Sequence, residues 1–193
     1  MNIFVLDKDP RRAAEAHCDK HICKMILESG QMLSTAHWFG WQRMLKAPTG
    51  LKQRDLMVWL RDNVREDLQP LWKMTHVGHP CTKWTQHVWG NYMWHSRLGL
   101  ALCEEYTRRY GREHKSHEYH RWLNRHIPPT FESTVEDPVG MTPFAVCMPD
   151  ECKIPGDPVE SYRNYYNLKK VRFARWRYTE KPTWFIQTTQ ETP

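Results

Sequence analysis

The sequence contains no apolar run of about 18 residues, the length that a membrane-spanning helix requires, so no segment is predicted to cross a membrane. It also lacks the basic start and the longer apolar core of a secretory signal, since its opening residues are MNIFVLDKDP. Six Cys are present, but no two of them form a CxxC pair. Together these absences predict a cytoplasmic protein with reduced thiols and no membrane contact.

Aromatic and basic residues are, by contrast, abundant. The 193 residues include ten Trp and eight Tyr, the formal charge is +6, and the pI is about 9.0. This combination favours a polyanionic partner, DNA or a nucleotide first, although a basic protein without such a partner is the alternative. With 40% hydrophobic residues the chain can bury a core. We expect one domain over residues 1–186 and a flexible C-terminal tail over residues 187–193.

Helical spacing of apolar residues predicts a mainly α-helical, compact domain with long irregular loops. Asp9 and Pro10 have the residue types of a helix start, and Gly111 that of a helix stop. NIFVL before Asp9 is predicted as a strand or a buried extended arm, and residues 127–156, rich in Pro, as an irregular segment. The predicted helices cover residues 10–36, 54–73 (interrupted near Pro70), 81–110, 116–127 and 157–178, the last opened by Asp157 and Pro158.

The run AHCDKHICKMILESGQ carries an unusual density of chemically active side chains. On a helical wheel His17, His21, Lys24, Glu28 and Gln31 share a strip roughly 80° wide. The strip lies beside the apolar stripe of the helix rather than opposite it. That position is typical of a cleft wall.

Three interpretations of the strip are open. His17 and His21 have the i, i+4 spacing of zinc ligands, but Cys18 stands where a zincin has Glu, and no third ligand has a fixed spacing, so no metal or other cofactor is predicted. Glu28 pairs with Lys24 across one turn in the structural interpretation. In the catalytic interpretation Glu28, beside His21 and Lys24, acts as a general base or stabilises a cation that develops at a sugar.

Several segments resemble a widespread family of tailed-phage proteins: MNIFVLDKDP, CDKHICKMILESGQMLSTAH, HPCTKW, YTRRYGREHK, MPDECK, YRNYYNLKKVRFARW and KPTWF. More distantly, Asp19-x-His21 with Glu28 seven residues later, together with KPTWF at 181–185, is similar to phage pyrimidine-dimer DNA glycosylases of the endonuclease V type. This second resemblance implies an all-helical, endonuclease V-like fold. It also implies excision of a base through an amine that attacks C1′, followed by strand cleavage.

The glycosylase resemblance assigns the central carboxylate to Glu28 and leaves the nucleophile open among the Met1 amine, Lys24, Lys20 and a water activated by Glu28. The family's nucleophile follows a removed Met, whereas Asn2 follows Met1 here. Leu27 and Gln31 replace two Arg of the family, so recognition of pyrimidine dimers is not expected to carry over.

A DNA-binding surface is predicted from further cationic and aromatic residues, since cations reach phosphates and aromatic rings stack on bases. A solvated basic helix with aromatic rings in the core is the alternative. The predicted DNA contacts are His17, Lys20, Gln31, Arg109, Lys115, Arg163, Lys169, Lys170, Arg172 and Trp184.

We therefore expect a DNA glycosylase, with possible abasic-site lyase activity, that acts on damaged or modified bases in the cytoplasm of a phage host. A DNA base-modifying or nucleotide-processing enzyme on the same scaffold and a non-catalytic phage DNA-binding protein are the alternatives. No obligate protein partner is evident from the sequence.

Overall fold

The protein is described by a computed structural model over residues 2–64, 70–129 and 140–186. In order, its elements are α1 (Pro10–Ala16), α2 (Asp19–Met44), α3 (Gln53–Asn63), α4 (Pro80–Thr85), α5 (Trp89–Tyr110), α6 (His117–Arg125), the 3-10 turn η2 (Asp150–Cys152), α7 (Pro158–Tyr165) and the π-helical turn η3 (Tyr166–Lys170). No strand occurs within these ranges, so the mainly helical prediction is confirmed. None of these helices combines the length and apolarity needed to span a membrane.

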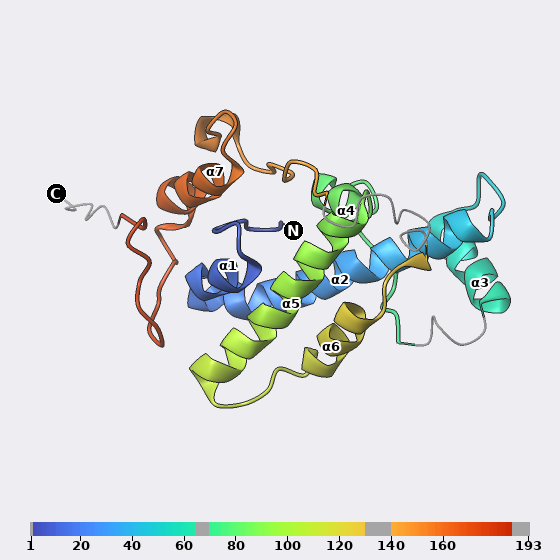
Figure 1. Ribbon diagram of the computed structural model, residues 1–193, viewed down its shortest axis with the longest axis horizontal. Helices are drawn as coiled ribbons and strands as arrows, with labels where there is room; N and C mark the ends of the chain where they lie inside the picture. Colours follow the sequence, from blue (N-terminus) through green and yellow to red (C-terminus); the bar gives the residue numbers. More distant parts are fainter. Residues whose placement is uncertain (1, 65–69, 130–139, 187–193) are drawn as a thin grey trace.

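Helices α2 and α5 form the centre of the molecule and pack against each other (Figure 1). Helix α1 packs against α5, α6 contacts both α5 and α2, and α3 lies at the C-terminal end of α2. Helix α7 lies at the opposite end from α3, on the side where the N-terminal arm runs. The two ends of α2 therefore belong to different neighbourhoods.

Two hydrophobic clusters correspond to these two ends. The first joins the N-terminal arm, α1, the beginning of α2, much of α5 and α7; its members include Phe4, Leu6, Ile22, Leu102 and Tyr162. The second joins the rest of α2 to α3, the beginning of α5 and α6; its members include Leu33, Trp38, Leu60, Tyr92 and Leu123. Residues that the sequence predicted as one apolar stripe on α2 are thus divided between two packing partners.

Helix boundaries that depend on local chemistry agree with the prediction. Asp9 caps α1 through its side chain, which accepts hydrogen bonds from the backbone N–H groups of Arg11 and Arg12. Asp157 caps α7 in the same way, with Glu160 as the donor. Gly111 ends α5 with a φ of 65°, a left-handed conformation that glycine adopts without steric cost.

The single helix predicted over residues 10–36 is wrong, because the chain breaks at His17 and Cys18. Both residues are extended, and α2 starts afresh with Cys18 as its N-cap. The backbone N–H of Asp19, a donor without a partner inside a helix, donates to the carbonyl of Arg175 at 2.9 Å. A contact from the far end of the chain thus satisfies the new helix start. Helix α2 also runs beyond the predicted end to Met44.

The helix predicted over residues 81–110 is likewise two helices. Helix α4 ends at Thr85, and α5 begins at Trp89. The side chain of Asn91 donates to the carbonyl of Trp84 at 2.8 Å, which satisfies an acceptor that the break exposes. The interruption is therefore built into the packing of α4 on α5.

Three further predictions are refined by the structure. The final helix, predicted over 157–178, ends with the π-helical turn at Lys170. Residues 2–6 form a buried extended arm, one of the two predicted alternatives. Helix α3 ends at Asn63, and part of the predicted interruption near Pro70 lies outside the described residues, as does the predicted tail over 187–193.

Candidate functional site around Glu28

The N-terminal arm brings Asn2 against α2. The backbone nitrogen of Asn2 lies 3.3 Å from Oε2 of Glu28, a contact between residues 26 positions apart. The Asn2 side chain is held in turn, since its Nδ2 donates to the carbonyl of Cys147 and its Oδ1 accepts from the hydroxyl of Tyr162 at 2.8 Å. Asn2 is buried, so one side of Glu28 faces a fixed backbone donor rather than water.

Glu28 also pairs with Lys24, as the structural interpretation predicted. Lys24 Nζ lies 3.1 Å from Oε1 of Glu28, and the side chains are 58% and 13% exposed, respectively. The pair is thus asymmetric, with an accessible ammonium group above a largely enclosed carboxylate. A carboxylate with a backbone N–H on one oxygen and an amine on the other can accept a proton or stabilise a cation beside it.

His21, earlier on the same helix, is a core residue. Its ring stacks on Phe4 with centroids 4.5 Å apart, and its Nδ1 is hydrogen-bonded to the hydroxyl of Tyr166. Burial lowers the pKa of His21 to about 2, and the nearby His17, Lys170, Lys24 and Lys20 add to that effect. His21 is therefore a neutral imidazole at physiological pH, suited to holding the arm and η3 in place.

Two further lysines belong to this neighbourhood. Lys20 Nζ lies 4.8 Å from the ring centroid of Phe173, and Lys170 Nζ lies 4.2 Å from that of Tyr165. Together with Lys24 they place three ammonium groups close enough to His21 to disfavour its protonation. The combination of lysines and rings is the kind of surface that phosphates and bases contact.

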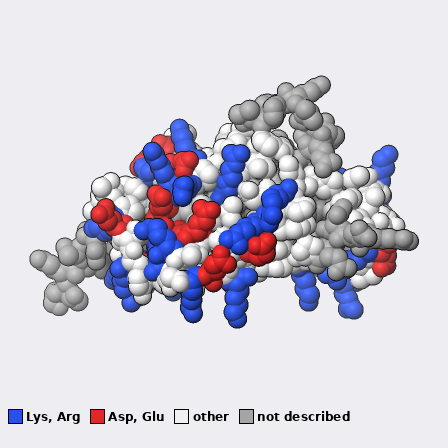
Figure 2. All heavy atoms as spheres, turned by 60° about the horizontal axis from the view of Figure 1, so that its bottom comes forward, with Lys and Arg blue, Asp and Glu red and all other residues white. Residues whose placement is uncertain are grey.

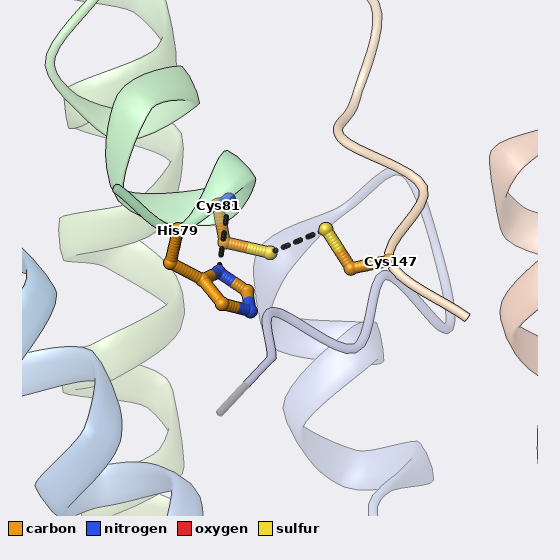
Figure 3. Close-up of side chains that lie close together, drawn as sticks. All are labelled: His79, Cys81 and Cys147. Atoms are coloured by element: carbon orange, nitrogen blue, oxygen red, sulfur yellow. Dashed lines mark hydrogen bonds between the residues drawn. The ribbon is translucent and has the colours of Figure 1, made fainter. Parts of the chain in front are cut away.

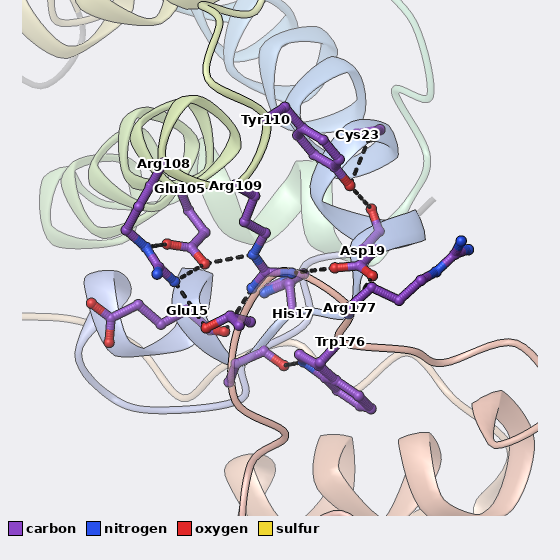
Figure 4. A network of polar contacts seen from close by, with 12 residues as sticks. Glu15, His17, Asp19, Cys23, Glu105, Arg108, Arg109, Tyr110, Trp176 and Arg177 are labelled. Atoms are coloured by element: carbon purple, nitrogen blue, oxygen red, sulfur yellow. Dashed lines mark hydrogen bonds and ion pairs between the residues drawn. The ribbon is translucent and has the colours of Figure 1, made fainter.

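Two of the predicted DNA contacts are buried instead. His17 is fully enclosed, with Nδ1 hydrogen-bonded to the carbonyl of Ala13, and burial lowers its pKa to about 4. Arg109 is also enclosed and belongs to the network shown in Figure 4. Neither offers a side chain to a phosphate in this structure.

The Arg109 network joins three helices (Figure 4). Arg109 lies 3.0 Å from Oδ1 of Asp19 on α2 and 2.6 Å from Oε1 of Glu105 on α5, and it donates to the carbonyl of Glu15 on α1 at 2.9 Å. The other oxygen of Asp19 accepts from the backbone N–H of Arg177 at 2.8 Å. Asp19, part of the motif that carries the glycosylase resemblance, therefore holds the fold together here.

Other predicted DNA contacts are at least partly exposed, but several already have partners. Arg163 pairs with Glu160 at 2.7 Å and Lys169 with Glu151 at 2.8 Å. Trp184 packs edge-on against Tyr166 with centroids 5.8 Å apart, which places it at the margin of the first cluster. Lys115 and Arg172 are exposed and Gln31 is half-buried. Met1, the remaining predicted catalytic residue, lies outside the described residues.

Charge on the face that Figure 2 brings forward is mixed. Basic side chains on this face alternate with acidic ones and form no patch of a single sign. The ion pairs around α6 are an example, since Arg121 pairs with both Glu113 and Glu118. A polyanion is therefore better matched by the lysines near His21 than by the pairs around α6.

A group that the sequence analysis missed lies on the other side of Asn2. His79 and Cys81, at the start of α4, and Cys147, on the segment before η2, place their potential ligand atoms within 4.8 Å of one another (Figure 3). The Cys81 thiol also lies 3.4 Å from Oδ1 of Asn2. The spacing His79-x-Cys81 was the available signal, but Cys147 is 66 positions from Cys81 and only the fold brings it there.

Comparisons of the chain with protein-family models, curated proteins and solved structures found no match.

Proposed function

We propose that this protein is a DNA glycosylase, with abasic-site lyase activity, that acts on damaged or modified bases. The observation that carries the proposal is the enclosed carboxylate of Glu28 between the Asn2 backbone nitrogen at 3.3 Å and the Lys24 amine at 3.1 Å. Base excision through an imine uses an amine as nucleophile, and a carboxylate beside it can serve as general base, while nearby cations bind the phosphates of the substrate. Lys20 and Lys170 supply such cations.

In the proposed reaction Glu28 has two tasks. When the bond between C1′ and the base breaks, the base leaves with the electron pair and C1′ becomes electron-deficient, so a carboxylate nearby lowers the energy of that state. The ammonium group of the attacking residue first releases one proton to solvent, and the resulting amine forms a bond to C1′. One N–H proton then passes to O4′ as the C1′–O4′ bond breaks and the sugar opens, which gives a protonated imine. Removal of a C2′ proton by the carboxylate next breaks the C3′–O bond and cleaves the strand.

Lys24 is the candidate amine among the described residues, because its Nζ contacts Glu28 and is accessible. A bound nucleotide must be turned out of the duplex to reach this position, as other base-excising enzymes require. The backbone N–H of Asn2 holds Glu28 at a fixed place before the substrate arrives, which favours catalysis by positioning.

Borohydride trapping tests the proposal directly. Wild-type protein is incubated with labelled duplexes that contain an abasic site or a set of modified pyrimidines, and covalent adducts are resolved by gel. We expect an adduct with the wild type and a loss of about 100-fold or more in Glu28→Gln, the order of magnitude of a removed general base. Glu118→Gln is the matched control, since Glu118 is an exposed glutamate paired with Arg121 on α6.

Peptide mapping of the adduct then identifies the nucleophile. An adduct on Lys24, lost in Lys24→Met but kept in Lys20→Met, supports the assignment of the amine. Base release without an adduct indicates a water nucleophile and keeps the glycosylase half of the proposal. Absence of adduct, released base and strand cleavage on every duplex would falsify the proposal and favour a DNA-binding protein or a modifying enzyme that leaves the strand intact.

A further inference from the structure

His79, Cys81 and Cys147 form a compact set of three nitrogen and sulfur donors. Their potential ligand atoms lie within 4.8 Å of one another, and the two thiol sulfurs are 3.5 Å apart. Figure 3 shows the thiols pointing toward each other, with the imidazole beside Cys81. We propose that these three residues bind one Zn²⁺ ion.

The sulfur–sulfur distance supports a shared metal rather than a covalent bond. Two thiolates at about 2.3 Å from a tetrahedral zinc ion lie about 3.8 Å apart, near the observed separation of 3.5 Å. A disulfide requires about 2.0 Å between the sulfurs. All six cysteines of the chain are free thiols in this structure. The donors are therefore already spaced for an ion to enter between them with small side-chain movements.

The donor types also suit zinc. Thiolate and imidazole are its preferred protein ligands, and hard metals such as Mg²⁺ and Ca²⁺ are matched less well by a set of two sulfurs and one nitrogen. The region is partly open, since Cys81 is fully buried whereas His79 and Cys147 are half-buried. Among the residues that the structure describes, no fourth His, Cys, Asp or Glu joins the group. A three-residue site leaves the fourth position of the tetrahedron for water or a substrate atom.

Surrounding hydrogen bonds hold two of the three ligands. The Asn2 side chain contacts the Cys81 thiol at 3.4 Å and the Cys147 carbonyl at 2.6 Å, and the hydroxyl of Tyr162 lies 3.4 Å from the backbone nitrogen of Cys147. These contacts of Asn2 and Tyr162 orient the cysteine ligands and connect the proposed zinc to Asn2, the residue that touches Glu28. Nδ1 of His79 accepts from the backbone N–H of Cys81 at 3.2 Å, and this contact is lost when the ring binds zinc, because a neutral imidazole has a single nitrogen lone pair to offer.

Metal binding replaces the two S–H protons by two S–Zn bonds and releases both protons to solvent. It also fixes α4, the segment around Cys147 and the arm to one another. The inference does not depend on the proposed glycosylase activity, because zinc binding is measured without DNA. If zinc binds and borohydride trapping gives no adduct, the zinc proposal is supported and the glycosylase proposal is contradicted.

The test uses the full chain, reduced and freed of metal, and titrated with Zn²⁺ against a chromophoric chelator. We expect one Zn²⁺ per chain. The dissociation constant should rise about 100-fold or more in Cys147→Ser and in His79→Asn, because each substitution removes one residue that binds the ion directly. Asn at position 79 can still cap α4, so that variant separates the lost ligand from a damaged helix start. Cys23→Ser, which removes an exposed thiol elsewhere on α2, is expected to bind zinc like the wild type.

Two measurements on the wild type make the test independent of how the variants fold. Co²⁺ in place of zinc is expected to give a tetrahedral visible spectrum with thiolate-to-metal charge transfer. Zinc is also expected to protect Cys81 and Cys147, but not Cys23, from alkylation. The proposal is overturned if the wild type binds zinc no more tightly than Cys147→Ser does. It is also overturned if the purified chain contains a Cys81–Cys147 disulfide and has no affinity for zinc after reduction.

Discussion

Two carboxylate–cation groups that both include residues of the central helix α2 differ in almost every physical respect. The Arg109 network is closed, with Arg109 and Glu105 nearly without exposed side-chain surface and every nitrogen of the contact directed at an oxygen. The Glu28 group is open on one side, since Lys24 is 58% exposed. Buried, fully paired charges hold elements together, whereas a pair with an accessible ammonium group can contact another molecule through that group. The same residue types are therefore structural in the Arg109 network and candidates for function around Glu28.

The largest expected effect comes from opening the closed group. Arg109→Met should lower the free energy of unfolding by about 3–5 kcal/mol, because the enclosed Asp19 loses its cation and the enclosed Glu105 keeps only the exposed Arg108. Urea unfolding at neutral pH, followed by circular dichroism, measures the change. Arg121→Met is the control, since Arg121 makes its two ion pairs at the surface, where each contributes about 1 kcal/mol or less. A cost for Arg109→Met as small as that of the control would contradict the assigned role.

Sequence reasoning predicted the features of these groups that are local. The Lys24–Glu28 pair follows from i, i+4 spacing, and Asp9, Asp157 and Gly111 mark helix ends because their own side chains or backbones satisfy the local geometry. The pattern that placed His17 on an accessible strip with His21 assumed one continuous helix. The two rings are still neighbours, with centroids 6.4 Å apart, but the chain breaks after His17 and this side chain is fully buried. A hydrogen bond from Asp19 to Arg175, far along the chain, supports that break.

Long-range partners explain the rest of what the sequence could not predict. Arg109 has the charge of a DNA contact, and only the fold shows that Asp19 lies opposite it. Asn2 carries no signal by itself, yet it connects Glu28 with Cys81 and Cys147. Spacing along the chain does not encode these approaches, because each depends on how the arm, α4 and α7 pack around α2.

The next effect in size is the dependence of unfolding free energy on pH, to which His21 contributes. The pKa of His21 is about 2 in the folded chain because of burial, whereas an unfolded histidine has a pKa of about 6.5. The unfolded chain therefore takes up the proton first as the pH falls below about 6.5. The contribution of His21 to stability is intact above that pH and declines below it by up to about 1.4 kcal/mol per pH unit, until the folded pKa is reached.

His21→Phe should accordingly flatten the dependence of unfolding free energy on pH. Between pH 6.5 and 5.0 the wild type is expected to lose about 2 kcal/mol more than the variant, and urea unfolding at several pH values measures the difference. His87→Asn, which changes an exposed histidine, is the control and should follow the wild type. Equal slopes for His21→Phe and the wild type would mean that His21 reaches solvent and is not the neutral core residue described above.

The smallest expected effect on stability comes from the open group, and it is the one that separates function from folding. Glu28→Gln keeps the shape of the side chain and an oxygen for the Asn2 backbone, and it removes a pair whose ammonium partner is mostly solvated. We expect a loss of at most about 1 kcal/mol in unfolding free energy, the upper range of pairs with one solvated partner. Asp19→Asn on the same helix is the matched comparison, because the same chemical change there weakens a buried contact with Arg109 and should cost several times more. If both variants destabilise equally, Glu28 is a structural residue like Asp19, and a loss of trapping in Glu28→Gln reports damage to the fold. If Glu28→Gln is as stable as the wild type and yet gives no adduct, the carboxylate is present for chemistry that the fold does not need.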